Sequence, residues 1–268
     1  MKFFLTESKN KVSFLIRELF VFTLKEGRAC IFAGSFFVLL FLSHHITLGL
    51  YRYDFLFISA VALQLLLLLF KIETLDEFKT IILFHLLGFC LEVFKTNPLI
   101  GSWSYPEAGI FKIFGVPLYS GFMYAAVGSY IAQAWRLLKF RLENYPSVYV
   151  SATVSLLIYL NFFTHHFIYD FRYILMAAII LIFWKARIYF TVTKKEYWMP
   201  LSIGFVLTAF FIWIAENIST FLGAWKYPDQ LITWTAVHMH KIGSWSLLVI
   251  ISFILVAELK RLKEKKEI

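Results

Sequence analysis

The sequence predicts an all-α membrane protein of about eight transmembrane helices, arranged as two parallel four-helix repeats. Of its 268 residues, 60% are hydrophobic and 16% are charged, whereas about 25% of the residues in a soluble domain are charged. Apolar runs recur along the whole chain, and a helix needs roughly 20 mostly apolar residues to cross a bilayer. A pattern of polar and aromatic residues also occurs twice, which indicates an internal repeat.

The expected elements follow the apolar runs. Residues 1–28 mix apolar and basic side chains, so we expect an amphipathic helix on the membrane surface. Repeat 1 covers residues 29–140, repeat 2 covers residues 147–260, and a basic tail, 261–268, ends the single integral membrane domain. The eight helices are expected at residues 29–50, 53–70, 80–96, 115–138, 147–167, 172–188, 199–220 and 236–259.

The doubled pattern is E-x-x-x-T, a short gap, and then G-x-W-x-Y-P-[D/E]. The first copy runs from Glu92 to Glu107, and the second from Glu216 to Asp229. The two glutamates are 124 positions apart, and the W-x-Y-P blocks are 122 apart. A His-His pair recurs at a distance of 121 and an Arg-Tyr pair at 120. Each repeat holds an even number of helices, so both repeats enter the membrane from the same side, related by a twofold axis along the membrane normal.

Charge sets the orientation. Twenty of the 26 Lys and Arg residues fall on the side that holds both termini, and six fall on the other side. By the positive-inside rule both termini are cytoplasmic, in a multi-pass protein of the bacterial cell membrane. The doubled motifs then lie at the outer face. The net charge of +9 reflects this asymmetry, and no nucleic-acid partner is expected; the expected partner is the lipid bilayer.

Glu92, Glu216 and His85 are the candidate catalytic residues. A carboxyl group in an apolar segment is costly, and in an aromatic pocket it can act as a general acid. The structural alternative is that each glutamate caps its own loop or pairs with an arginine. His85 precedes Glu92 by seven residues, on the same helix face, and has no counterpart in repeat 2.

The motif aromatics and two arginines are the candidate substrate-binding residues. Gly in each motif permits a tight turn and Pro stiffens its exit, so each loop is expected to fold back over the bundle. Aromatic faces there could contact a polyene or stabilise a carbocation; the alternative is an ordinary interfacial aromatic belt. The candidates are Trp103, Tyr105, Trp225, Tyr227, Arg52 and Arg172.

The sequence carries no recognised metal signature. If a metal binds, the ligands would come from the His pairs, because one histidine of each pair could join the glutamates in a symmetric site; hydrogen-bonded interfacial histidines are the alternative. Those histidines are His44, His45, His165 and His166. No cofactor and no oligomeric state is indicated.

One resemblance rests on Glu92, Trp103, Tyr105 and the segment from Gly115 to Tyr124. Through these residues, and over nearly its whole length, the chain resembles the YoaT-like family of bacterial integral membrane proteins. That family has a domain of unknown function, so the resemblance implies no activity. A weaker similarity links Glu92, Trp103, Tyr105 and Gly115-Val-Pro117 to membrane carotenoid hydratases and lycopene cyclase-type domains. Lycopene cyclase domains place paired acids after this segment, where the chain has Leu118-Tyr-Ser120.

Two functions follow from these observations. The first is an enzyme that acts on an isoprenoid or other lipid by acid catalysis at an outer-face pocket. The second is a small-molecule transporter or binder that uses the interface between the two repeats. The two differ in whether the substrate is chemically converted or moved unchanged across the membrane, and the absence of a charged pathway into the cytoplasmic half weighs against transport. The sequence leaves open whether the two glutamates line one shared cavity or cap two separate loops.

Overall fold

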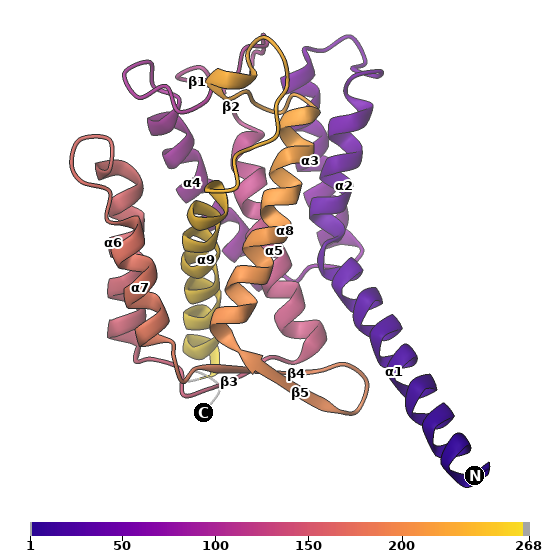
Figure 1. Cartoon of the computed structure of the whole chain (residues 1–268). Helices are drawn as coiled ribbons and strands as arrows, with labels where there is room; N and C mark the ends of the chain where they lie inside the picture. The colour runs from indigo at the N-terminus through magenta and orange to yellow at the C-terminus, as the bar shows by residue number, and fades with distance from the viewer. Residues whose placement is uncertain (1, 265–268) are drawn as a thin grey trace.

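The computed structural model describes residues 2–264, and most of them are helical (Figure 1). Met1 and the last four residues of the expected basic tail lie outside the described residues. The helices are α1 (Lys2–Ala29), α2 (Ile31–Leu42), α3 (Arg52–Leu69), α4 (Leu75–Lys95), α5 (Ser120–Leu138), α6 (Val148–Thr164), α7 (Arg172–Ile182), α8 (Leu201–Phe221), the short 3₁₀ helix η1 (Pro228–Gln230) and α9 (Lys241–Glu264).

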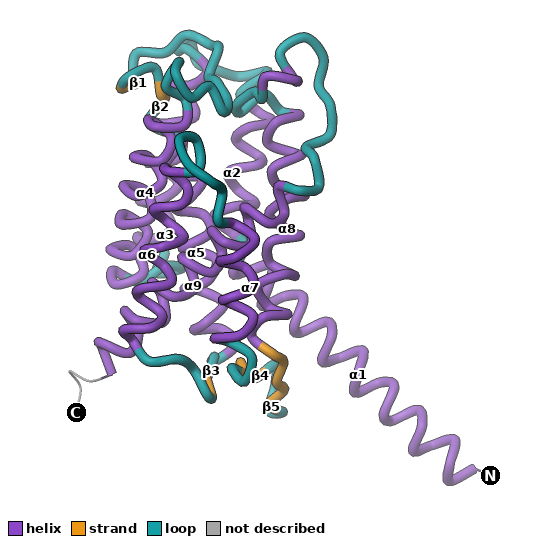
Figure 2. Tube along the Cα trace, turned by 60° about the vertical axis from the view of Figure 1, so that its left-hand side comes forward, coloured by secondary structure: helices purple, strands orange, loops and turns teal. Residues whose placement is uncertain are grey.

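Helices α2 to α9 form a bundle, and α1 runs obliquely away from one end of it (Figure 1). That same end carries both termini and the strands β3 (Arg141–Glu143), β4 (Arg187–Thr191) and β5 (Glu196–Pro200). The other end carries the loops of the doubled motif and the short strands β1 (Lys112–Ile113) and β2 (Val116–Pro117). Figure 2 shows loops gathered at these two ends, with helices between them. We call the second of these the motif end.

Three of the described helices are long and apolar enough to cross a membrane. They are α3, α8 and residues Lys241–Arg261 of α9, while α2, α6 and α7 are apolar but shorter. The expected positions of helices at residues 53–70 and 199–220 agree with α3 and α8 to within two residues. Helix α4 begins five residues before its expected start because Thr74 caps it: the Thr74 hydroxyl accepts from the Glu77 amide, and the Glu77 carboxylate accepts from the Thr74 amide.

The prediction of a purely helical chain was wrong at the end that carries the termini. Strands β3, β4 and β5 form an antiparallel sheet there, where a helix to residue 188 and a basic turn were expected. Strands β4 and β5 each contain two adjacent aromatic residues, Tyr189-Phe190 and Tyr197-Trp198, and aromatic residues favour strands. Arg187 stacks over Trp198 across the hairpin at 4.4 Å, and Arg141 stacks over Tyr189 at 4.1 Å.

Three helices are shorter than expected at the motif end. Helix α2 ends at Leu42, and the chain then turns at Leu48 and Gly49, which have positive φ angles, before α3 begins. Helix α5 begins at Ser120, since Gly115 has a φ of 81° and Val116–Pro117 pair with Lys112–Ile113 in a hairpin. Helix α9 begins at Lys241, five residues after its expected start. The preceding loop is bound to α8, because the backbone of Val237 is hydrogen-bonded to the side chains of Trp213 and Asn217.

A second cluster of buried aromatic and aliphatic side chains lies at the motif end, apart from the main core between the helices. It joins α2 and α3 to both motif loops. Its buried members include Phe36, Leu40, Tyr53, Tyr105, Tyr119, Trp225 and Tyr227. The loops are therefore packed into the bundle, where they can hold a fixed site.

Candidate functional site

Glu92 lies in the last turn of α4 and is 2% exposed. Its carboxylate accepts three hydrogen bonds from aromatic side chains. Trp103 Nε1 and Tyr105 Oη donate to Oε2, each at 2.7 Å, and Tyr124 Oη donates to Oε1 at 2.8 Å. The first two donors come from the motif loop and the third comes from α5. A buried carboxylate is stable only when such donors replace water.

Glu216 lies in the last turn of α8, is equally buried, and is held in a similar way. Tyr227 Oη donates to its Oε1, and Trp245 Nε1 donates to its Oε2. Tyr227 is the motif tyrosine of the second copy, and Trp245 lies on α9. Each glutamate is therefore bound by the tyrosine of its own loop and by an aromatic residue of the helix that follows the loop.

The two motif loops pair with each other. Ser104 N donates to Lys226 O at 2.9 Å, and Lys226 N donates to Ser104 O at 3.0 Å. Both residues lie between the Trp and the Tyr of their copies. Gly101 and Gly223 have φ angles of 58° and 65°, a conformation that side chains disfavour, and each turns the chain in the loop that follows its helix. The expectation of tight turns at these glycines is confirmed.

One cavity of about 50 Å³ lies between the two glutamates. Both carboxylates line this cavity, and each also accepts hydrogen bonds from its own motif loop. The two glutamates therefore share one cavity and also close their two loops. The rest of its wall is aromatic apart from one methionine. Its lining residues are Glu92, Trp103, Met123, Tyr124, Glu216, Trp225, Tyr227 and Trp245. The site thus presents two acids in an aromatic enclosure, with contributions from both halves of the chain.

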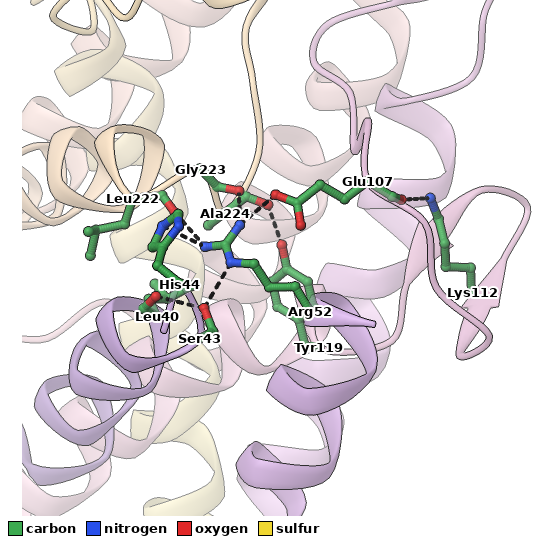
Figure 3. A network of polar contacts seen from close by, with 10 residues as sticks. All are labelled: Leu40, Ser43, His44, Arg52, Glu107, Lys112, Tyr119, Leu222, Gly223 and Ala224. Carbon is green, nitrogen blue, oxygen red and sulfur yellow. Dashed lines mark hydrogen bonds and ion pairs between the residues drawn. The ribbon is translucent and has the colours of Figure 1, made fainter. Parts of the chain in front are cut away.

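Neither glutamate pairs with an arginine. Arg52, at the start of α3, instead holds the second motif loop to the first half of the chain (Figure 3). Its guanidinium donates to Glu107 Oε1 at 2.6 Å and to the carbonyl oxygens of Leu222 and Gly223. Nε donates to Ser43 Oγ at 2.9 Å. Arg52 therefore has a structural contact set at the motif end and does not line the cavity.

Arg172, at the start of α7, pairs with Asp170 at 3.2 Å and also does not line the cavity. The Tyr105 hydroxyl donates a hydrogen bond to Glu92, but Tyr105 does not line the cavity. Trp103, Trp225 and Tyr227 do line it. Of the six candidate substrate-binding residues, these three share one enclosure.

His85 is not brought to the glutamates. Its ring lies against Phe122 on α5, with 4.7 Å between ring centroids, and Nδ1 is buried without a hydrogen-bond partner in the described residues. A Cβ on Gly121 would approach the His85 ring at 2.6 Å, so α5 packs directly onto this side chain. His85 therefore fills the interface between α4 and α5.

The four paired histidines lie in two separate places. His44 Nε2 contacts Leu222 O at 2.9 Å, and His45 stacks near Phe41. His165 and His166 contact Lys95 Nζ, at 3.3 and 2.7 Å. Within residues 2–264, no group of three or more His, Cys, Asp or Glu side chains is placed to hold a metal ion.

Three lining residues were not among the candidates: Met123, Tyr124 and Trp245. Tyr124 and Trp245 are 121 positions apart, an offset shared with the other doubled features. That offset was the signal that could have found them. A buried polar cluster at the opposite end of the bundle was also missed, where Glu73 accepts from Gln64, Ser129 and Gln133. It is formed by residues far apart in the sequence.

Comparison with known proteins gives a family but no activity. Residues 18–253 match the family described as "Protein of unknown function (DUF817)". The chain is 50% identical over 251 residues to "Uncharacterized protein YoaT" of Bacillus subtilis (strain 168), covering 93% of this chain and 94% of that protein. No solved structure matches the chain. The chain therefore belongs to the DUF817 family.

Proposed function

We propose that this protein is a multi-pass protein of the bacterial cytoplasmic membrane that binds and carries a small cationic molecule. The ligand would occupy the cavity between two parallel four-helix repeats, α2–α5 and α6–α9. The observation that carries the proposal is that Glu92 and Glu216, one from each half, line the same aromatic cavity.

Exposed apolar side chains support the membrane assignment. Leu65 on α3, Leu157 on α6, Leu181 on α7 and Phe211 on α8 all face outward from the bundle. Monomeric soluble proteins rarely expose continuous apolar surface over several helices. A lipid bilayer would cover these side chains, with the three long apolar helices crossing it and the shorter ones packed beside them.

The pairing of the motif loops supports the twofold relation between the repeats. In a symmetric dimer, a residue near the axis contacts its own counterpart across the interface. Ser104 and Lys226 hold corresponding positions in the two motifs and bond to each other through both of their backbone groups. The cavity would then lie near the axis, where a carrier with parallel repeats holds its substrate.

The wall of the cavity favours a cation. When ionised, the two carboxyl groups supply negative charge, and the faces of Trp and Tyr rings attract cations with about 0.5–2 kcal/mol each. The contact between Lys241 and Tyr227 illustrates this chemistry, since the Lys241 ammonium lies 4.5 Å from the centre of a ring that lines the cavity. A small ammonium ligand would use the same kind of contact.

The volume of the cavity favours a small ligand. A cavity that holds one water molecule needs about 10–15 Å³ by this measure, so 50 Å³ accommodates a few waters or one small ligand. The same acids could protonate an isoprenoid or other lipid, but such a chain would require the cavity to open. We therefore place the carrier ahead of the enzyme.

The test is a binding titration with methylammonium and tetramethylammonium on the full-length protein in nanodiscs, followed by tryptophan fluorescence. We expect saturable binding by at least one of the two. Glu92→Gln and Glu216→Gln should each weaken it about tenfold, equivalent to 1.4 kcal/mol, because the amide removes the negative charge while keeping the shape. Glu143→Gln, an exposed change on β3, is the matched control.

Uptake of the labelled ligand into proteoliposomes then separates a carrier from a binder. Wild-type binding in both Gln variants, or no binding of either cation, would refute the proposal. Conversion of an added isoprenoid that is lost in Glu92→Gln would instead establish acid catalysis.

A further inference from the structure

We propose that a second site at the motif end binds a phosphate group, on a basic cluster formed by Lys95, His165, His166, Arg172 and Lys241. These residues come from the end of α4, the loop between α6 and α7, and the starts of α7 and α9. None of them lines the cavity between the two glutamates.

Lys95 is the centre of the cluster. It is the last residue of α4 and is only 5% exposed. Its ammonium group contacts His166 Nε2 at 2.7 Å and His165 Nε2 at 3.3 Å. Among the described residues, no carboxylate lies within ion-pair distance of it. A buried ammonium without a counter-charge is unfavourable, which points to an anion missing from the set.

The two neighbouring histidines are neutral and do not offset the charge of Lys95. Burial, followed by the charge of Lys95, lowers the pKa of His166 to about 4. Burial also lowers the pKa of His165, and the charges of Lys95 and Arg172 act in the same direction. Both rings are therefore neutral at neutral pH. They accept from Lys95 through Nε2 and supply no negative charge to it.

Arg172 has an unused donor. Its terminal nitrogen pairs with Asp170, but its Nε is buried and has no hydrogen-bond partner in the part of the chain that the structure describes. A buried donor without an acceptor is rare and costly. An oxygen of a bound anion would satisfy it.

The corresponding arginine of the first half shows what is missing. Arg52 is surrounded by acceptors and receives the Glu107 carboxylate at 2.6 Å (Figure 3). The residue that corresponds to Glu107 in the second motif is Asp229, which lies instead near His238 at 3.9 Å. No acidic residue of the second loop reaches Arg172. An external anion would take the place that Glu107 fills beside Arg52.

The charge of the cluster favours phosphate over a single carboxylate. Lys95, Arg172 and Lys241 bring up to three positive charges, and Asp170 pairs directly with Arg172. Glu216 and Asp229 also act on Lys241, but Glu216 is bonded to Tyr227 and Trp245. A phosphate group carries one to two negative charges and several acceptor oxygens. Its source is either a lipid headgroup or free phosphate.

The first experiment titrates inorganic phosphate into the full-length protein in a phosphate-free maltoside detergent. Binding is measured by calorimetry, and the histidine carbon resonances are followed against pH. We expect saturable binding and an upward shift of the His166 pKa from about 4, because a nearby anion favours the imidazolium. The resonances are read on the wild type, so this result does not depend on a variant that folds.

Lys95→Gln and Arg172→Gln should each weaken phosphate binding at least tenfold, while Arg141→Gln, an exposed change on β3, should not. If Arg172→Gln fails to fold, Arg172→Lys replaces it. This variant keeps the positive charge but lacks the Nε donor, so it should also weaken phosphate binding. In parallel, native mass spectrometry of protein taken from phosphatidylglycerol membranes tests for a retained phospholipid that the same variants lose. Lipid retention without phosphate binding assigns the site to a headgroup. Absence of both, or equal binding by all variants, overturns the proposal.

Discussion

At the scale of single residues, matching positions in the two halves of the chain have different surroundings. Glu92 and Glu216 are alike, since aromatic donors bind both of them. Arg52 and Arg172 are unlike. Arg52 donates to four acceptors, which include two carbonyl oxygens of the second motif segment, whereas Arg172 pairs with one acid and has an unused donor. The first arginine therefore stabilises the fold more than the second.

The two arginines can be compared by a single substitution in each. Arg52→Gln should lower the free energy of unfolding by about 1–3 kcal/mol, because it leaves Glu107 and two partly buried carbonyl groups without their partner. Arg172→Gln should cost less than about 1 kcal/mol in phosphate-free buffer, since it also relieves the excess of positive charge beside Lys95. Thermal unfolding in detergent measures both, and an equal loss for the two would contradict this.

At the scale of the elements, the site depends on how closely α4 and α5 approach. A Cβ at Gly88 would lie 2.3 Å from Tyr124 Cγ, and one at Gly128 would lie 2.3 Å from Phe84 Cδ2. Only glycine permits this approach. It places the Tyr124 hydroxyl on α5 within 2.8 Å of Glu92 on α4. The helix packing thus sets the third hydrogen bond to the carboxylate.

Gly88→Ala tests this dependence. The added methyl group should displace Tyr124, cost about 1–3 kcal/mol through overpacking and weaken ligand binding in the cavity. Gly34→Ala is the control, because Gly34 lies in α2 with no atom within 4 Å of its Cβ position. It should be neutral or slightly stabilising, since alanine favours a helix by about 1 kcal/mol. Unaltered binding by Gly88→Ala would show that Tyr124 is dispensable.

At the scale of the whole molecule, the two ends of the bundle differ in composition and structure. The end with both termini carries the sheet of β3, β4 and β5 and most of the basic residues, and the motif end carries the paired loops. The excess of positive charge predicts that the first end is cytoplasmic. The cavity and the basic cluster would then face the outside of the cell.

Cysteine labelling in intact cells tests this orientation. Cys30 and Cys90 are free thiols and are first replaced by serine. Ile232→Cys, in an exposed loop at the motif end, should react with a membrane-impermeant maleimide. Lys194→Cys, in the turn between β4 and β5, should react only after the membrane is permeabilised. The opposite result would reverse the topology.

The positions of the helices could be predicted from the sequence because apolar length is a local property of the chain. Helices α3 and α8 were placed to within two residues in this way. The ends of α2 and α5 at the motif side were harder to predict, because the chain turns at Gly49 and Gly115 in the neighbouring loops. The sheet was missed because a short aromatic strand and a helix end carry similar apolar signals.

The sequence by itself determined which residues matter at the motif end. A carboxylate that follows an apolar run needs donors, and the repeated Trp and Tyr beside Glu92 and Glu216 are those donors. Only the tertiary structure decided that the two acids share one cavity, that Tyr124 and Trp245 complete its wall, and that His85 lies apart. The physical reason is that the cavity joins residues from the two halves of the chain, with Glu92 and Glu216 124 positions apart, and only the packing of α4, α5, α8 and α9 brings them together.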